Sequence, residues 1–144
     1  MYQKHNANPK GRKTGDCVIR AFSLASGKTW EDTLTDLYRI AMDLKTSPTE
    51  SETYAKYADQ LGFVSHKVEL VNGHKPTPKT FAQSHPAGTF VLRLAHHVVT
   101  VKDGVYYDIW DCGAKSVYKY WEVLINDNRR DSYQVPGRRS QGIG

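Results

Sequence analysis

The sequence predicts an α+β fold in which N-terminal helices pack on a C-terminal antiparallel sheet. Between residues 16 and 61 apolar side chains recur at helical spacing, whereas beyond residue 62 they mostly follow the pattern of strands. Helical segments that precede the strand segments, instead of alternating with them, are typical of this class. The 144 residues contain no repeat and no linker. We therefore expect one domain over residues 1–125 and a basic tail over 126–144 that is partly loop or disordered.

Three helices are expected in the first half of the chain. The first covers about 16–26, with Asp16 as its N-cap and Gly27 just beyond its end. The second begins after Thr29, whose hydroxyl can cap it. The third spans about 49–61.

Beyond residue 62 the pattern predicts strands and one short helix. The segment TPKTFAQS has Thr as a cap and Pro at the first helical position, so a helix is expected at 77–84. The strongest strand signal is GTFVLRLAHHVVTV. The expected strands cover residues 63–70, 88–101, 105–111 and 116–125.

Composition and cysteine content limit the class of protein. Hydrophobic residues make up 39% of the chain, and no apolar run approaches the roughly 20 residues that a membrane-spanning helix needs. The N-terminus is polar, so we expect no secretory signal and no membrane partner. Cys17 and Cys112 are too few for a disulfide scaffold, which favours free thiols in a reducing cytoplasm.

The net charge of +5 is concentrated at the two ends of the chain. Residues 1–16 and 126–144 carry the whole excess, and 17–125 contains equal numbers of basic and acidic residues. Solvated ends are the interpretation that this pattern favours, and it argues against a nucleic-acid partner. The alternative is an RNA or DNA binder that uses these basic ends, and its binding would depend steeply on salt.

Cys17 stands at the predicted start of the first helix. Free backbone N–H groups and the positive end of the helix dipole favour a thiolate at that position. A structural cysteine would more naturally lie in the middle of a helix. The position therefore indicates a nucleophile, provided that the rest of the chain supplies a base.

A predicted hairpin supplies the base. Asp103-Gly104 is the preferred dipeptide for a two-residue type I′ turn between strands. From that turn the register pairs Lys102 with Val105, and Val101 with Tyr106. His97 and Asp108 then share one face as diagonal neighbours, about 7–8 Å apart at Cα.

The same hairpin offers a second histidine–aspartate pair. On the opposite face His96 would lie across from Asp111. The register allows only one of the two pairs to face Cys17. We take His97 and Asp108 as the first choice and His96 with Asp111 as the alternative.

These residue types form a nucleophilic site if they meet. An imidazole takes the proton of a nearby thiol and stabilises the thiolate. An acceptor on the far ring nitrogen fixes the tautomer and the orientation of the ring. Cys17, His97 and Asp108 would serve as nucleophile, base and orienting group.

The segments GDCVIRAFS, HHVVTV and YYDIWDCG resemble the corresponding parts of papain-like cysteine peptidases, particularly the small bacterial and phage-encoded members. The resemblance covers about residues 5–125. It implies a papain-like fold, Cys17 as nucleophile, His97 as base and Asp108 as its orienter. It also implies a peptide or protein substrate, cleavage of an amide bond, and a bacterial or phage-infected host cell.

One position departs from that family. Its members usually carry a Gln about six residues before the nucleophile, whose amide helps to hold the oxyanion, and Gly11 occupies that place here. The amides of Asn8 or Asn6, together with the Cys17 backbone N–H, are the candidate replacements. The second interpretation is a catalytically weak or inactive papain-like fold that acts as a protein-binding module in a phage–host interaction.

Other residues give weaker signals. Cys112 follows Asp111 in a WDCG turn, near the rim of the expected site, as a turn residue or a second thiol. Trp110 and Trp121 are expected in the core, with the wall of a substrate groove as the alternative.

The remaining sequence signals come from two arginines and from the histidines. Arg20 and Arg93 each interrupt an apolar run and are expected to be buried with partners. The histidines are scattered without a CxxC or HExxH motif, so no metal is expected. Nucleotide-binding glycine motifs are absent, and we expect no cofactor.

Overall fold

The structure is a computed structural model that describes residues 1–124. The predicted tail at 126–144, and the last residue of the predicted domain, lie outside the described residues. Among the residues described, no helix combines the length and the apolar character that crossing a membrane requires.

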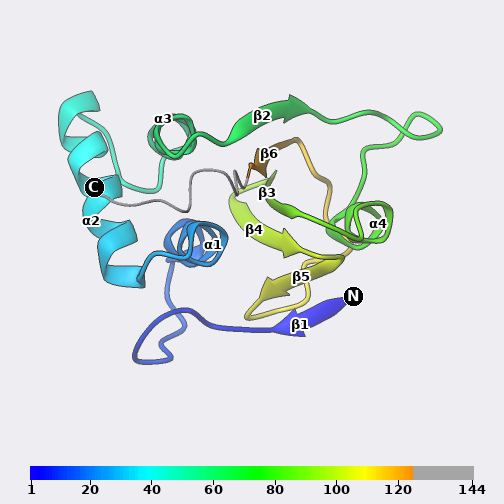
Figure 1. Cartoon of the computed structure of the whole chain (residues 1–144), viewed down its shortest axis with the longest axis horizontal. Coiled ribbons are helices and arrows are strands. Elements are labelled where there is room, and N and C mark those ends of the chain that lie inside the picture. The colour runs from blue at the N-terminus through cyan, green and yellow to red at the C-terminus, as the bar shows by residue number, and fades with distance from the viewer. Residues whose placement is uncertain (125–144) are drawn as a thin grey trace, which may run out of the picture.

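Four helices and six strands make up the described part of the chain (Figure 1). The helices are α1 (Cys17–Ser26), α2 (Trp30–Leu44), α3 (Ser51–Gln60) and α4 (Pro78–Ser84). The strands are β1 (Tyr2–Lys4), β2 (Val64–Lys67), β3 (Thr89–Leu94), β4 (His97–Lys102), β5 (Val105–Asp108) and β6 (Lys119–Val123). They form one sheet in the order β1-β5-β4-β3-β6-β2. The predicted α+β class is confirmed.

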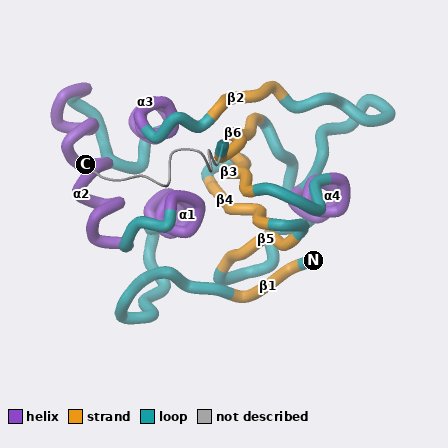
Figure 2. The backbone as a smooth tube through the Cα atoms, viewed as in Figure 1, coloured by secondary structure: helices purple, strands orange, loops and turns teal. Residues whose placement is uncertain are grey.

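Helices lie on both faces of the sheet. Helices α1, α2 and α3 lie on one side, and α4 lies on the other (Figure 2). The larger core, between α1–α3 and the sheet, includes Phe22, Leu37 and Val91, which are fully buried. A second core under α4 includes Phe81 and Val101. Burial of these side chains on both faces stabilises the sheet, at about 25 cal/mol per Å² of apolar surface.

The sheet is mixed, which corrects the antiparallel sheet expected from the sequence. Strand β1 pairs in parallel with β5, and Lys4 lies opposite Asp108. The three residues of β1 are largely polar and carry no strand signal of their own. The partner strand, not the local sequence, therefore makes this segment extended.

The predicted strand over 88–101 is also corrected, because it is two strands joined by a tight turn. Leu94 pairs with His97, so Ala95 and His96 form the turn between β3 and β4. His96 has a positive φ of 55°. The turn lacks the Gly or Asn that usually marks such a conformation, and this is why the sequence pattern missed it.

The helix ends were predicted with mixed success. Thr29 caps α2 by accepting a hydrogen bond from the Asp32 backbone N–H. Thr77 caps α4 in a capping box, with Pro78 at the first helical position. Asp16 precedes α1 as expected, but its side chain makes no capping hydrogen bond. Its carboxylate binds other side chains instead, as described below.

Gly113 is required by a close contact in the turn after β5. A Cβ at this position would lie 2.1 Å from the Tyr106 hydroxyl oxygen, which donates a hydrogen bond to Asp111. We expect Gly113→Ala to lower the free energy of unfolding by about 1–3 kcal/mol, because the turn must shift. Gly15→Ala is the matched control, since a Cβ there meets nothing within 4 Å. Urea unfolding should separate the two variants, and equal midpoints would contradict this prediction.

Candidate active site

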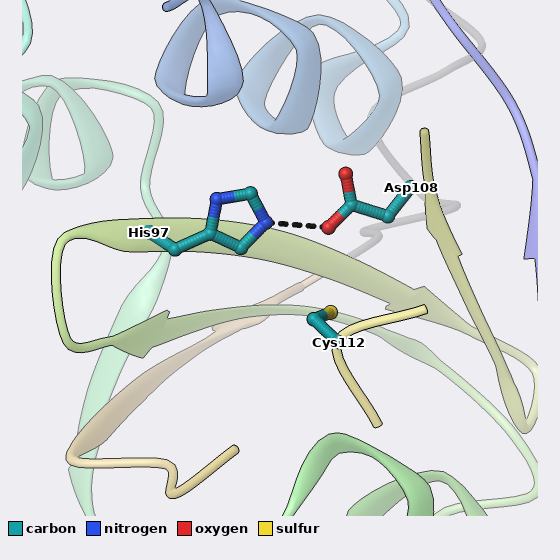
Figure 3. A group of neighbouring side chains, drawn as sticks. All are labelled: His97, Asp108 and Cys112. Carbon is teal, nitrogen blue, oxygen red and sulfur yellow. Dashed lines mark hydrogen bonds and ion pairs between the residues drawn. The ribbon is translucent and has the colours of Figure 1, made fainter. Parts of the chain in front are cut away.

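The β4–β5 hairpin brings His97 and Asp108 together. Asp103 and Gly104 have φ values of 50° and 79°, as the predicted type I′ turn requires. The predicted register is confirmed where the strands pair, for example at Val101 and Tyr106. The His97 Nε2–H donates to Asp108 Oδ2 over 2.5 Å (Figure 3).

The N-terminal strand fixes the backbone of Asp108. The Tyr2 hydroxyl and the His5 backbone N–H both donate to the Asp108 carbonyl oxygen, over 3.0 and 2.9 Å. The Ile109 backbone N–H donates to Asp108 Oδ1 over 2.8 Å. Both the backbone and the carboxylate of Asp108 are therefore held before any substrate arrives.

Arg20 connects Asp108 to the start of α1. Its Nη1 donates to Asp108 Oδ1 over 3.1 Å, and its Nε donates to Asp16 Oδ1 over 2.8 Å. All three side chains are almost completely buried. Asp16 Oδ2 accepts further hydrogen bonds from Trp30 Nε1 and Asn8 Nδ2. The sequence indicated a buried Arg20 with partners, and the structure identifies them.

Cys17 is the first residue of α1 and is half-buried. Burial opposes ionisation of the thiol, but the His97 ring, the Val98 backbone N–H and the Arg20 charge together lower the pKa of Cys17. In Figure 3 the His97 ring nitrogen that does not bind Asp108 lies on the side of the ring that faces α1. One nitrogen of the imidazole therefore binds the Asp108 carboxylate. The other nitrogen lies on the side of α1, the helix that carries the Cys17 thiol.

The charges of the site favour an ionised pair. Burial opposes protonation of His97, but the hydrogen bond to Asp108 and the two neighbouring thiols raise the pKa of His97 to about 11. Although burial has the opposite effect, the His97 ring, the Ile109 N–H and Arg20 lower the pKa of Asp108. Near neutral pH these directions favour an imidazolium between a carboxylate and a thiolate.

Cys17 and His97 line an open cleft of about 690 Å³. The cleft lies between the start of α1, the start of α3 and the turn between β3 and β4. A ligand can thus reach the half-buried sulfur from solvent. Its wall also includes Gly15, Glu50, Tyr54, Arg93 and Tyr118.

Trp110 packs against the His97 ring and lies outside the core, which corrects its expected place. The two ring centroids are 4.9 Å apart with an angle of 42° between the planes. The Trp110 side chain remains exposed, whereas Trp121 is buried as expected. Only 11% of the His97 side chain is accessible. The indole therefore covers part of the His97 ring.

Cys112 lies beneath the histidine, and not near a rim as the sequence suggested. It is completely buried, and burial raises the pKa of its thiol. His97, Asp108 and Cys112 have potential ligand atoms within 4.8 Å of one another (Figure 3). Ligand atoms around a tetrahedral zinc ion lie about 3 Å or more apart. The 2.5 Å separation of His97 and Asp108 therefore fits a hydrogen-bonded pair better than two metal ligands.

The alternative pair His96 and Asp111 is wrong. His96 is exposed in the β3–β4 turn and not on a strand. The Asp111 carboxylate accepts hydrogen bonds from the Tyr106 hydroxyl and the Gly113 N–H. Within residues 1–124 no hydrogen bond joins His96 to Asp111.

The two candidate oxyanion amides do not lie in the cleft. Asn8 Nδ2 donates to Asp16, and Asn6 Nδ2 donates to the Arg12 carbonyl over 3.0 Å. Neither side chain lines the cleft beside Cys17. The only sequence signal for an oxyanion role was the position of Asn6 and Asn8 in the loop before α1. In the structure both side-chain amides donate hydrogen bonds to acceptors within that loop.

The sequence carries no signal that Tyr2 belongs to this site, and it offered Trp110 only as the alternative, a wall of a substrate groove. Tyr2 comes from a strand without a local signal, and Trp110 follows β5 by two residues. The spacing of Trp110 from Asp108 was the one available clue, because a side chain close to the strand end can fold back over the hairpin.

Compared with family models, with curated proteins and with solved structures, the chain has no match in any of the three.

Proposed function

We propose that this protein is a thiol hydrolase, a cysteine peptidase or a related enzyme with a papain-like arrangement, that cleaves an amide bond in a peptide or protein. The observation that carries the proposal is the His97 ring, held by Asp108 over 2.5 Å and adjoining the Cys17 thiol at the start of α1. Both cysteines are free thiols. A reducing compartment, such as the cytoplasm of a bacterial or phage-infected cell, is part of the proposal.

The proposed reaction assigns a role to each of the three residues. The Cys17 thiolate attacks the substrate carbonyl carbon, and a C–S bond forms. As the tetrahedral intermediate collapses, the C–N bond breaks and the leaving nitrogen takes a proton from His97. His97 then accepts a proton from water, which attacks the thioester and releases the acid and the Cys17 thiolate. Asp108 holds the ring in position and stabilises its protonated form throughout.

The start of α1 offers a donor for the oxyanion. The backbone N–H of Cys17 is the first of the helix, so no helical carbonyl lies four residues before it. That N–H and the positive end of the helix dipole are fixed before reaction, which is the requirement for electrostatic stabilisation of an oxyanion.

Labelling of the thiols with iodoacetamide tests the proposal without a known substrate. We expect Cys17 to react faster than glutathione below pH 8, with a midpoint below the ordinary thiol pKa of 9.0. The direction of this shift follows from the lowered pKa of Cys17. As the pH falls, the Cys17 thiolate persists to a lower pH than the thiolate of a free cysteine does. Mass spectrometry of tryptic peptides separates Cys17 from buried Cys112, which should remain unlabelled. A Cys17 that reacts no faster than glutathione would refute the proposal.

A second candidate function is a binding module without turnover. It is favoured by the wall of the cleft, in which no Asn or Gln side chain lies among the lining residues. In that case a protein partner would bind equally well to the Cys17→Ala variant. A partner that is cleaved only by the wild type would exclude it.

A further inference from the structure

Three basic residues lie side by side in one row of the sheet. Lys67 of β2 pairs with Lys119 of β6, and Lys119 pairs with Arg93 of β3. Directly paired residues of antiparallel strands project from the same face. Here it is the face that α1–α3 cover, because Trp121 and Val91, two positions along the same strands, belong to that core. We call Lys67, Lys119 and Arg93 the basic row.

The basic row is not neutralised by neighbouring carboxylates. Within residues 1–124 none of its three side chains takes part in an ion pair. Among residues 1–124, Glu50 is the only acidic residue in the wall of the cleft, and it forms no ion pair with Arg93. Like charges directly opposite each other destabilise a sheet. Such a row is therefore more favourable when an anion lies across it.

The inner end of the basic row reaches the proposed active site. Arg93 is half-buried and lines the same cleft as Cys17 and His97. Its other cross-strand partner is Val98, the residue that follows His97. An anionic group of a ligand in this cleft can therefore meet the guanidinium while the reactive bond lies at the thiol.

The position of Lys119 continues the row away from the cleft. Its Nζ lies 5.4 Å from the centre of the Trp121 ring, and the Trp121 ring packs edge-on against Tyr54 of the cleft wall. Lys67 lies on β2, the edge strand, and is exposed. Neighbouring strands are about 4.8 Å apart, so the three residues extend over roughly 10 Å.

We propose that the cleft selects peptides with an acidic segment beside the scissile bond. A carboxylate of the substrate pairs with Arg93, and further carboxylates are attracted by Lys119 and Lys67. This inference rests on the proposed function for the bond that is cleaved, but the anion site itself does not depend on turnover. A guanidinium holds a carboxylate through two parallel hydrogen bonds, whereas the two lysines contribute mainly charge.

An acidic peptide fits this row better than a nucleic acid. Nucleic-acid sites track many phosphates along the backbone, and the basic row offers three cations. Residues 17–125 contain equal numbers of basic and acidic residues, so this part of the chain has no net positive charge to attract a long polyanion. A short acidic peptide needs only a few cations next to a cleft.

Equilibrium binding to the Cys17→Ala variant tests the anion site apart from catalysis. The probes are a fluorescein-labelled peptide with three consecutive glutamates, its counterpart with three glutamines, and a single-stranded thymidine oligonucleotide. We expect the glutamate peptide to bind about three- to fivefold more tightly than the glutamine peptide. Arg93→Gln in the same background should remove most of this preference, and Arg39→Gln, an exposed arginine outside the cleft, should retain it.

Two outcomes would overturn the inference. One is equal binding of the glutamate and glutamine peptides. The other is Arg93-dependent binding of the oligonucleotide without binding of the glutamate peptide, which would assign the row to nucleic acid.

Alkylation of otherwise wild-type protein links the anion site to the thiol. The ratio of the iodoacetate rate to the iodoacetamide rate at Cys17 should fall about three- to fivefold in Arg93→Gln and stay unchanged in Arg39→Gln. An unchanged ratio in Arg93→Gln overturns the inference while the proposed function stands. A Cys17 that is unreactive toward both reagents refutes the proposed function, and the binding experiment then still decides the anion site.

Discussion

Replacing His97 by alanine should raise the pH at which Cys17 becomes reactive and slow its alkylation sharply at pH 6. The ring and its positive charge are the first influences that lower the pKa of this thiol against the opposing effect of burial. Without them burial dominates, and the pKa of Cys17 rises. For each unit of rise we expect the rate at low pH to fall about three- to tenfold, because a more basic thiolate is scarcer but more nucleophilic.

His96→Ala is the matched control for this experiment. It removes the same side chain one position earlier, from an exposed turn that holds no partner of Asp108. The His96→Ala protein should keep the wild-type midpoint and rate. If His97→Ala and His96→Ala react alike over the whole pH range, the thiol does not depend on the His97 ring and the proposed mechanism is wrong.

Asp108→Asn should give an intermediate result. The amide can still accept a hydrogen bond from His97, but it no longer stabilises the protonated ring by charge, so the pKa of His97 falls. The labelling midpoint of Cys17 should then lie between those of the wild type and His97→Ala. A midpoint equal to that of the wild type would show that the carboxylate charge is not needed.

Local signals were sufficient for the part of the site that lies in one hairpin. The Asp103-Gly104 turn sets the register of the two strands that it joins, so the proximity of the His97 and Asp108 side chains could be predicted from sequence alone. The helix start at Cys17 was predicted for the same reason, from residues next to it. Each of these features depends on contacts within a few positions of a turn or a helix end.

The features that sequence reasoning missed depend on contacts between distant segments. The turn at Ala95 and His96 lacks a glycine, and only the pairing of Leu94 with His97 reveals it. Asp16 has the residue type of an N-cap, yet the guanidinium of Arg20 and the indole of Trp30 compete successfully for its carboxylate. A charged hydrogen bond in a buried position outweighs a local capping bond, which contributes about 1 kcal/mol.

Replacing Arg20 by methionine should be the most destabilising single change in the site. Arg20 lies between the carboxylates of Asp16 and Asp108, and all three are almost fully buried. Methionine retains much of the volume but leaves both carboxylates without their shared cation. Breaking a buried ion pair by removing one partner costs about 3–5 kcal/mol, and we expect a loss of this size in the free energy of unfolding at pH 7.

The pH dependence of this loss distinguishes lost charge pairing from lost packing. In the wild type the pKa values of Asp16 and Asp108 are lowered, because hydrogen bonds and charges outweigh the opposing effect of burial. A carboxyl group whose pKa is lower in the folded state than in the unfolded state stabilises the fold at pH values above its unfolded-state pKa. This contribution is lost as the pH falls through the folded-state pKa. In Arg20→Met the buried carboxyls favour protonation. The difference between the two proteins should therefore be largest at pH 7 and shrink towards pH 3–4.

The double variant Asp16→Asn/Arg20→Met provides the control that keeps this prediction testable. Asparagine removes one of the two uncompensated charges while its side-chain oxygen can still accept from Trp30 and Asn8. The double variant should therefore be more stable than Arg20→Met alone at pH 7, and urea unfolding of both proteins measures the difference. Equal stabilities, together with a loss that does not change with pH, would mean that Arg20 acts through packing. Asp108 would then be held by its backbone contacts with β1 and not by the guanidinium.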